Sequence, residues 1–369
     1  MSDKKEWQRA DHILCIRLDS LGDVLMTTPA LRALKESHPG RRLTLLTSQS
    51  GAAIAPLIPE VDKIIIYDPP WMKATAPAED SRHEFEMIDR LKEESFDAAV
   101  IFTSFSQSPL PAALMTFLAG IPLRLAHCRE NPYHLLTDWV HETDHFGQAE
   151  LRHEVRRQLD LVAHIGCRAS NERLSLEIRP SALETVDQCL KQTGIDTNRA
   201  WVVIHPGSTA PSRRYAPEHF ARVAELLSSE HGFQILFTGT ELETELVESI
   251  RARMQSGSFS VTGKLGIEEF SALVFVAPLL ISNNTGPVHI AAAVSTPVVD
   301  LYALTNPQHT PWMVRHRTLN HDVPCRYCYK SICPMGHHNC LRLVTPDSVV
   351  EAVLDLLDVQ EQKFLPMSC

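Results

Sequence analysis

The sequence predicts an α/β protein with two domains, each built on a parallel sheet that helices cover on both faces. Short runs of Ile, Val and Leu alternate with helix-length segments, and strands that are apolar on both faces suit a buried parallel sheet. The alternation pauses in the polar segment 171–180 and restarts at residue 201. A chain of 369 residues that is 44% hydrophobic is long enough for two cores. We therefore expect a linker at 178–181, between domains 1–180 and 181–345.

Ten apolar segments are the expected strands, and each is bounded by turn residues or by a helical pattern. In the first domain they are 12–18, 42–47, 63–67, 97–102 and 123–126, and in the second 201–204, 233–237, 259–261, 279–282 and 297–302. A final helix is expected at 346–357, because Val349, Val350, Val353, Leu354 and Leu357 recur at helical spacing.

Charge and composition exclude several classes of function. The formal net charge of −10 gives no general attraction to nucleic acid or to an anionic membrane. No apolar run reaches the roughly 18 residues of a membrane-spanning helix, and the polar start of the chain does not resemble a signal peptide. We expect a cytoplasmic protein with at most peripheral membrane contact. Neither the G-x-G-x-x-G fingerprint nor a P-loop occurs.

An acidic turn follows the first expected strand. Asp19, Ser20 and Gly22 break the apolar run, and a helical pattern starts directly after them, so Asp23 falls in the first helical turn. That turn lies at the carboxyl edge of the sheet, where open α/β folds bind ligands. Asp23 is therefore a candidate site residue, although an acid at this position also simply offsets the helix dipole. The motif alone does not decide between these interpretations.

A second strand–turn–helix unit, at 281–293, is typical of an anion site. A run of small polar residues leads into an alanine-rich helix, with Thr285, Gly286 and His289 at its start. The unpaired N–H groups of a first helical turn, together with the helix dipole, favour a phosphate. The alternative is an ordinary capped turn in which His289 is a half-buried histidine with satisfied hydrogen bonds.

Other polar residues follow neighbouring strands of the second domain. Ser208 lies in a glycine turn after the strand 201–204, Arg213 comes shortly behind it, and Glu243 follows the strand 233–237. Arg213 and the helix start at 286 suit the phosphates of a nucleotide diphosphate, and Glu243 suits the hydroxyl groups of its ribose.

These segments resemble the glycosyltransferase family 9 heptosyltransferases. The resemblance rests on 18–31, on 205–215, on Gly239 with Glu243 and on 282–292, and it covers nearly the whole chain in order. It implies a GT-B fold, with two Rossmann-like domains facing a cleft and the last helix, 346–369, crossing back to the first domain. It also implies inverting transfer from an ADP-heptose-type donor to a lipopolysaccharide core or another glycan or lipid-linked acceptor, without a catalytic metal or cofactor.

The same resemblance assigns roles by position. Asp23 matches the general base, Glu243 the carboxylate that binds ribose, and Thr285, Gly286 and His289 the diphosphate site. Arg213 stands where a phosphate-binding lysine is usual, and a planar guanidinium grips phosphate differently from an ammonium group. Asn284 stands where the family usually has Asp, and it replaces a charge with an amide.

Four cysteines in the segment 324–341 form a separate signal, and they are Cys325, Cys328, Cys333 and Cys340. Four thiolates in one loop suit a structural zinc or iron site that would stabilise a segment with little core of its own. Free thiols or transient disulfides are the alternative.

Three functions stay open at this point. The first is heptose transfer to a lipopolysaccharide core. The second is transfer by a family member that uses another donor sugar or a protein or small-metabolite acceptor. The third is a catalytically silent protein whose metal-stabilised loop serves assembly, and Asn284 is the residue that favours it.

Overall fold

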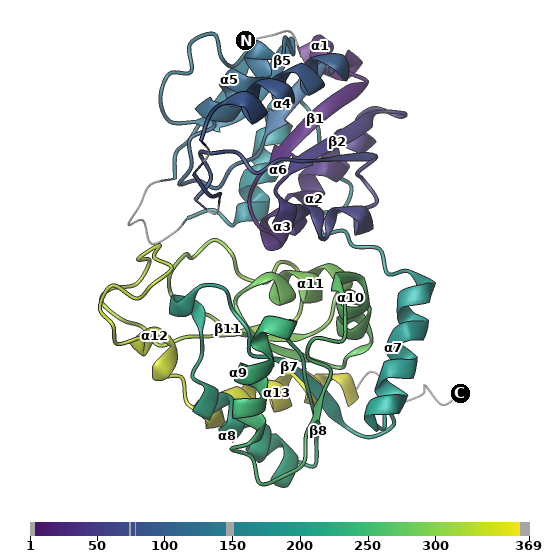
Figure 1. Cartoon of the computed structure of the whole chain (residues 1–369), viewed down its shortest axis with the longest axis vertical. Coiled ribbons are helices and arrows are strands. Elements are labelled where there is room, and N and C mark those ends of the chain that lie inside the picture. Colours follow the sequence, from purple (N-terminus) through teal and green to yellow (C-terminus); the bar gives the residue numbers. More distant parts are fainter. Residues whose placement is uncertain (1–3, 74, 78, 145–150, 362–369) are drawn as a thin grey trace. The chain divides into compact units, whose positions relative to one another are not determined.

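The computed structural model describes residues 4–73, 75–77, 79–144 and 151–361. Contacts along the chain separate it into two compact units, Met1–Glu177 and Ile178–Cys369 (Figure 1). The segment where the sequence predicts a linker opens the second unit, and Pro180 is the first residue of a helix, a position where its missing N–H costs nothing. Each unit is described here by itself.

The first unit contains a parallel six-stranded sheet in the order β3-β2-β1-β4-β5-β6. Its strands are β1 (His12–Arg17), β2 (Arg42–Thr47), β3 (Lys63–Ile66), β4 (Ala98–Ile101), β5 (Leu123–Cys128) and β6 (Asp138–His141). Its helical segments are α1 (Lys4–Arg9), α2 (Leu21–Glu36), α3 (Gln49–Ala52), η1 (Ala55–Leu57), α4 (Arg82–Glu93), α5 (Leu110–Leu118) and α6 (Glu154–His164).

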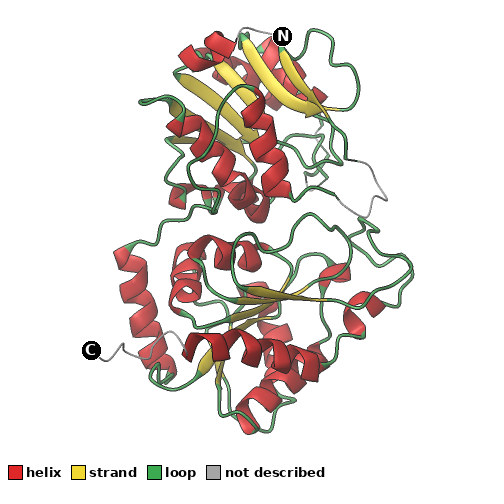
Figure 2. Ribbon diagram, turned by 180° about the vertical axis from the view of Figure 1, so that it is seen from behind, coloured by secondary structure: helices red, strands yellow, loops and turns green. Residues whose placement is uncertain are grey.

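Helices cover both faces of this sheet, as Figure 2 shows. On one face α4 and α5 bury apolar side chains, among them Met87, Leu91 and Met115, in one cluster with strand residues such as Ile16 and Ile101. Helices α2 and α6 pack against each other in a separate layer. Burial on both faces explains why the strands of this unit are apolar throughout.

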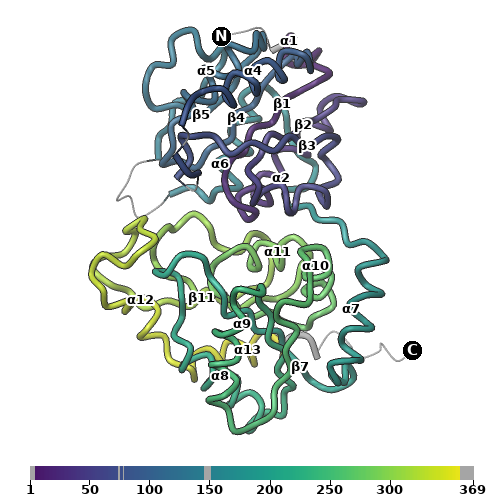
Figure 3. Tube along the Cα trace, in the orientation of Figure 1, coloured from purple at the N-terminus to yellow at the C-terminus, as the bar shows by residue number. Residues whose placement is uncertain are grey.

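The second unit repeats the architecture, with the strand order β12-β11-β10-β7-β8-β9. Its strands are β7 (Trp201–His205), β8 (Gln234–Phe237), β9 (Phe259–Ser260), β10 (Leu280–Asn283), β11 (Val298–Leu301) and β12 (His316–Leu319). Its helical segments are α7 (Pro180–Thr193), η2 (Pro211–Arg213), α8 (Pro217–Ser229), η3 (Glu241–Glu243), α9 (Thr244–Arg251), α10 (Ile267–Val276), α11 (Gly286–Val294), α12 (Asn339–Arg342) and α13 (Pro346–Glu361). The traces of α10 and α11 lie side by side (Figure 3).

The last helix has the predicted apolar stripe. Within the second unit, α13 packs on α8, β11 and β12. Its buried face, which includes Val349, Val353 and Leu356, belongs to the same core as Phe220 and Val223 of α8. The expected crossing of this segment to the first domain stays a prediction. The expected end of the segment, 362–369, lies outside the described residues.

Two short strands, β6 and β12, were not predicted. They carry the sequences DWVH and HRTL, so neither contains an apolar run. Both lie at an edge of their sheet, where only one side has a partner strand and polar residues are tolerated. Among the residues described, no helix is both long and apolar enough to cross a bilayer.

Strand order places one switch point in each sheet. In the first unit, β1 lies between β2 and β4, so the loops after β1 and β4 leave in opposite directions. In the second unit, β7 lies between β8 and β10 in the same way. In open α/β sheets the crevice outside the carboxyl ends of such a strand pair is where ligands bind. Asp23, Ser208 and Thr285 lie in the segments that directly follow β1, β7 and β10.

Candidate active site

Asp23 lies at the switch point of the first sheet, in the first turn of α2, and donors hold both of its carboxylate oxygens. The hydroxyl of Ser20 donates to Oδ2 at 2.7 Å, and the backbone N–H of Ser20 reaches the same oxygen at 3.2 Å. Nη2 of Arg17 donates to Oδ1 at 3.1 Å. The side chain keeps 15% of its surface exposed. Asp23 is therefore fixed in direction and still reachable by a small ligand.

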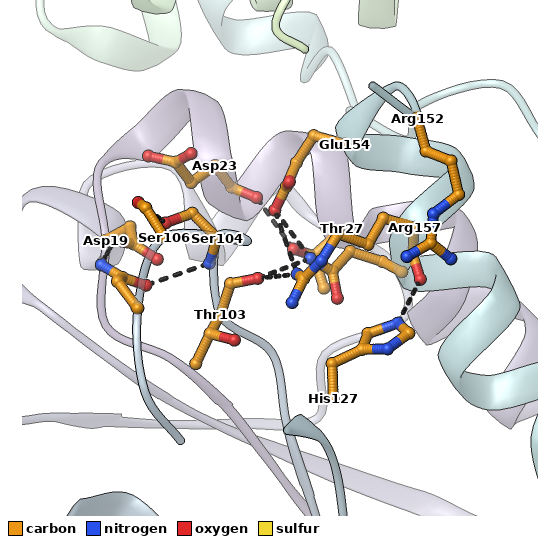
Figure 4. Close-up of polar contacts among 12 residues, drawn as sticks. Asp19, Asp23, Thr27, Thr103, Ser104, Ser106, His127, Arg152, Glu154 and Arg157 are labelled. Atoms are coloured by element: carbon orange, nitrogen blue, oxygen red, sulfur yellow. Dashed lines mark hydrogen bonds and ion pairs between the residues drawn. The ribbon is translucent and has the colours of Figure 1, made fainter. Parts of the chain in front are cut away.

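Arg17, the last residue of β1, connects three carboxylates. Its side chain is 0% exposed, and its nitrogens lie 2.9 Å from Oδ2 of Asp19, 3.1 Å from Oδ1 of Asp23 and 2.8 Å from Oε1 of Glu154. Figure 4 shows the side chains of Asp19, Asp23 and Glu154. The buried guanidinium group of Arg17 thus holds three carboxylates in place. A buried charge is tolerated only when it has such partners. The sequence did not single out Arg17 or Glu154.

Glu154 is held from a second side as well. It opens α6 and is 0% exposed, and Nε2 of Gln158, one turn further along the helix, donates to Oε1 at 2.7 Å. The same Nε2 atom donates to the backbone carbonyl of Thr103 at 3.0 Å. Because Thr103 follows β4, this bond ties α6 to the other strand of the switch point. The acid that supports Arg17 therefore cannot turn away easily.

Arg157, further along α6, forms a second buried ion pair, with Glu142. Nε of Arg157 lies 2.5 Å from Oε2 of Glu142, and both side chains are buried. The backbone carbonyl of Arg157 accepts a hydrogen bond from Nε2 of His127 at 2.9 Å (Figure 4). Burial, helped by the charge of Arg157, lowers the pKa of His127 to about 4. His127 is thus neutral at neutral pH and braces α6 against β5 rather than supplying charge.

The acidity of Asp19 is strongly perturbed in this group. Burial raises its pKa to about 6; the charge of Arg17 opposes this rise and the charge of Asp23 adds to it. Nε2 of Gln107, from the loop after β4, donates to Oδ1 at 2.6 Å. Burial disfavours the charge of Arg17 too, but Asp19, Glu154 and Asp23 together raise its pKa. Arg17 therefore stays protonated, and Asp19 is an acid whose pKa lies near 6.

Asp19→Asn is expected to stabilise the protein above pH 6. Because the folded-state pKa of Asp19, about 6, is higher than the ordinary value of 3.8, the folded form binds the proton more tightly. Stability from this group is present below pH 4 and is lost as the pH rises through 6. The expected gain in the variant is about 3 kcal/mol at pH 8 and near zero at pH 4, at about 1.4 kcal/mol per pKa unit. Urea unfolding at both values measures it, and a gain at pH 4 as large as at pH 8 would contradict it.

Glu243 lies in a tight contact at the end of β8. Its Oε2 atom accepts hydrogen bonds from the N–H of Thr240 at 2.7 Å and from the hydroxyl of Thr240 at 3.0 Å. A Cβ atom placed on Gly207 would lie only 1.9 Å from Oε1 of Glu243. The glycine after β7 is therefore required by the close approach of this carboxylate. Glu243 keeps 22% exposure and faces the loop at the switch point.

Asn283, the last residue of β10, links this loop to its own strand. Its Nδ2 atom donates to the carbonyl of Pro206 at 2.8 Å, and its Oδ1 atom accepts from the N–H of Tyr215 at 2.9 Å. The residue is 0% exposed. Asn283 thus fixes both ends of the segment that carries Ser208 and Arg213. Nothing in the local sequence distinguishes Asn283 from its neighbour, since consecutive asparagines look alike in a turn.

Ser208 and Arg213 differ in their surroundings. Ser208 is buried, and its hydroxyl donates to the carbonyl of Ala210 at 3.3 Å. Arg213 is half-buried in η2, and its guanidinium group makes no hydrogen bond or ion pair with the described part of the chain. Burial raises the pKa of Asp300, and the charge of Arg213 is one of the effects that oppose this rise. Arg213 is therefore a cation at the carboxyl edge of the second sheet that has no acidic partner among the described residues.

Helix α11 begins at Gly286, directly after Thr285. The hydroxyl of Thr285 donates to the carbonyl of Asn283 at 3.3 Å and does not cap the helix. Pro287 follows in the first turn. His289 is 4% exposed, and the centre of its ring lies 6.5 Å from that of His309. The helix start thus offers uncapped backbone N–H groups beside Thr285 and Gly286, the arrangement that favours an anion.

Asn284 is turned into the protein. Its Nδ2 atom donates to Oδ2 of Asp300 at 3.1 Å and to the carbonyl of His309 at 2.9 Å, and it is 4% exposed. Its amide hydrogens are therefore used by the protein. Asp300 was not predicted as a site residue, because an acid inside an apolar strand gives no motif.

The four cysteines do not form the predicted metal site. All four are free thiols, and Sγ of Cys325 has a polar contact with Nε2 of His337 at 3.7 Å. Within 4–73, 75–77, 79–144 and 151–361, no three residues among His, Cys, Asp and Glu gather closely enough to hold an ion. Cys325 and Cys340 both pack against the apolar cluster of Tyr302, Leu304 and Val323, and burial raises the pKa of Cys340. The geometry of the described residues therefore does not support the predicted metal site.

Most of the chain matches the model of a known family. The family model described as "Glycosyltransferase family 9 (heptosyltransferase)" matches residues 85–339, more than half of the chain. The chain belongs to glycosyltransferase family 9. This protein is therefore a glycosyltransferase, as the sequence predicted.

Individual relatives agree with this assignment. The lipopolysaccharide heptosyltransferase 2 of Escherichia coli K12 is 24% identical over 361 residues, which are 95% of this chain and 99% of that protein. The family 9 glycosyltransferase of Veillonella parvula has a similar structure, with a TM-score of 0.77, 21% identity and coverage of 95% and 98%. The E. coli heptosyltransferase WaaC, solved with ADP-2-deoxy-2-fluoro heptose, gives a TM-score of 0.65 with 18% identity and coverage of 93% and 99%. The predicted GT-B fold of this glycosyltransferase is thus confirmed.

Proposed function

We propose that this glycosyltransferase moves a heptose from an ADP-heptose-type donor to a hydroxyl group of a lipopolysaccharide core or a related acceptor. The lipopolysaccharide heptosyltransferase 2 of Escherichia coli K12 aligns over nearly its whole length, and the solved heptosyltransferase WaaC holds an ADP-heptose analogue. The observation that carries the proposal is the convergence at the switch point of the second sheet. There the half-buried Arg213, an uncapped helix start and a carboxylate lie on neighbouring loops.

Each of these groups has a proposed task on the donor. Arg213 and the backbone N–H groups of α11 at Thr285 and Gly286 would bind the diphosphate, which leaves with the charge that develops in the transition state. His289 would donate a further hydrogen bond there. Glu243, whose carboxylate is held by Thr240, would accept hydrogen bonds from the ribose. In this proposal the charge on the leaving group is stabilised by side chains and amides.

Asp23 would act as the general base for the acceptor hydroxyl. Transfer with inversion is a single displacement, in which one bond forms at the anomeric carbon as the bond to the diphosphate breaks, and the hydroxyl proton passes to Asp23. Arg17 and Ser20 stabilise the ionised form of Asp23 and so make it a weak base. Positioning and late proton transfer would therefore supply most of the acceleration.

A transfer assay tests this proposal directly. The purified protein is incubated with ADP-heptose and a lipopolysaccharide core that lacks its heptoses, and the product is analysed by mass spectrometry and by the anomeric configuration of the new bond. We expect addition of one heptose with inversion. A panel of other nucleotide sugars and glycan acceptors is run in parallel. Transfer from a different donor alone would establish the second function, and no transfer or donor hydrolysis with any pair would establish a silent protein.

A further inference from the structure

Asp300 is a buried acid that the proposed mechanism does not use. It lies in β11, which pairs with β10 on one side and with the edge strand β12 on the other, and its register partners are Ser282 and Thr318. The residue is 0% exposed. Its Oδ2 atom accepts from Asn284 at 3.1 Å and from the hydroxyl of Thr318 at 3.5 Å. Its Oδ1 atom has no hydrogen-bond partner among the described residues.

The buried environment of Asp300 disfavours its negative charge, and it would disfavour a second acid beside it even more. Burial raises its pKa to about 8, although hydrogen bonds from Asn284 and Thr318 and the charge of Arg213 act in the opposite direction. At neutral pH the carboxyl is therefore largely protonated. An amide at position 284 is compatible with either form of this acid, because it brings donors and no charge. A carboxylate at 284 would face a second carboxyl at about 3 Å, and two such groups cannot both ionise.

The amide of Asn284 also reaches the segment between β11 and β12. The second hydrogen bond of this side chain goes to the backbone carbonyl of His309, at 2.9 Å. The backbone N–H of Asn284 donates to the carbonyl of Leu301 at 3.1 Å. The ring of His309 lies edge-on to the ring of His289 in α11. The side chain of Asn284 thus joins strand β11 to the segment of His309, and the ring of His309 in turn faces His289 in the helix whose start would bind the donor phosphates.

We propose that Asn284 and Asp300 act as a matched pair that positions the His309 segment beside the first turns of α11, so that an amide is required at 284 because a carboxyl occupies 300. This inference rests on the proposed binding of the donor diphosphate at α11. It makes Asn284 a positioning residue with a role in donor binding. The exchange of charge for an amide at 284 is then part of an intact site and does not indicate a silent protein.

A mutant cycle tests the pair. The full-length proteins are wild type, Asn284→Asp, Asp300→Asn and the double variant, and thermal unfolding is followed at pH 6 and pH 8. We expect Asn284→Asp to lower Tm by about 10 °C at pH 8 and by less at pH 6, where one of the two acids takes up a proton more readily. The double variant, which carries one acid in the pair, is expected to regain most of this loss.

Binding of ADP, measured by calorimetry at 10 °C and pH 6, tests the positioning role. The carboxyl group that replaces the amide at position 284 in the double variant has no amide hydrogen for the carbonyl of His309. The ADP affinity of the double variant is therefore expected to stay about tenfold below that of Asp300→Asn, the effect of one lost hydrogen bond. The double variant keeps this measurement open if Asn284→Asp alone does not fold. An equal ADP affinity in the double variant and in Asp300→Asn would overturn the positioning role.

Asn283→Asp is the matched control. This neighbour is equally buried and undergoes the same chemical change, but its partners are the backbone groups of Pro206, Gly207 and Tyr215. Its loss of Tm is expected to be the same with and without Asp300→Asn, as for independent sites. If the double variant at 284 and 300 recovers no more than this control does, the matched pair is refuted. Failure of wild type to bind ADP would instead refute the proposed donor site, while the Tm cycle would still test the pair.

Discussion

Asp23→Asn is expected to reduce the rate of transfer by about 10²–10⁴-fold, the range that removal of a general base produces. The amide occupies the same space, and its oxygen can still accept a hydrogen bond from Arg17 or Ser20. It cannot take up the proton of the acceptor hydroxyl. The loss should therefore appear in kcat, with a smaller change in the KM for the acceptor. Initial rates with ADP-heptose and a core acceptor measure both constants.

Two further measurements show whether this loss is chemical. ADP affinity should be unchanged, because the proposed donor site belongs to the unit Ile178–Cys369 and Asp23 to the other. The matched control is Asp89→Asn in α4, an acid of the first unit whose side chain is 70% exposed, and it should keep its full rate. A rate in Asp23→Asn within a few-fold of wild type would remove Asp23 from the role of base. An equal loss of ADP binding would point to misfolding.

Local patterns in the sequence were enough to predict the two sheets and the position of Asp23. Apolar runs on both faces identify buried parallel strands, and the turn of Ser20 and Gly22 fixes the register of α2, so Asp23 necessarily falls in its first turn. The same logic placed Thr285 and Gly286 at the start of α11. These predictions need only the chain near each residue, which is the information that periodicity contains.

The partners of these residues could not be predicted in this way. Arg17 ends an apolar strand and would ordinarily be assigned to the surface, but it is buried by contacts with Glu154, which is 137 positions away. Asp300 and Asn284 likewise belong to different segments, and only the register of β10 and β11 brings them together. Polar pairs of this kind depend on tertiary geometry. Many acidic residues in the chain have similar neighbours in the sequence, so the local sequence does not show which of them form such pairs.

Arg17→Met is expected to destabilise the first unit by about 3–5 kcal/mol at pH 8, the cost of leaving buried charges without their partner. Methionine fills much of the volume, but Asp19, Asp23 and Glu154 then face one another without a cation. Asp23 also loses the donor that fixes Oδ1, so kcat should fall along with stability. Urea unfolding at pH 5 and pH 8 measures the first effect, and the transfer assay measures the second.

The pH dependence of Arg17→Met separates charge from packing. Without Arg17, the three acids should have raised pKa values in the folded state, so the variant should lose stability as the pH rises from 5 to 8. Adding Glu154→Gln removes one of the uncompensated charges and should restore part of the loss at pH 8. Arg41→Met is the matched control: Arg41 is equally buried, but its bonds go to Ser37 and to the carbonyls of Trp7, Ala10 and Leu34. Its deficit should be nearly equal at both pH values, and an equally flat deficit in Arg17→Met would mean that a packing defect, rather than unpaired acids, accounts for the loss.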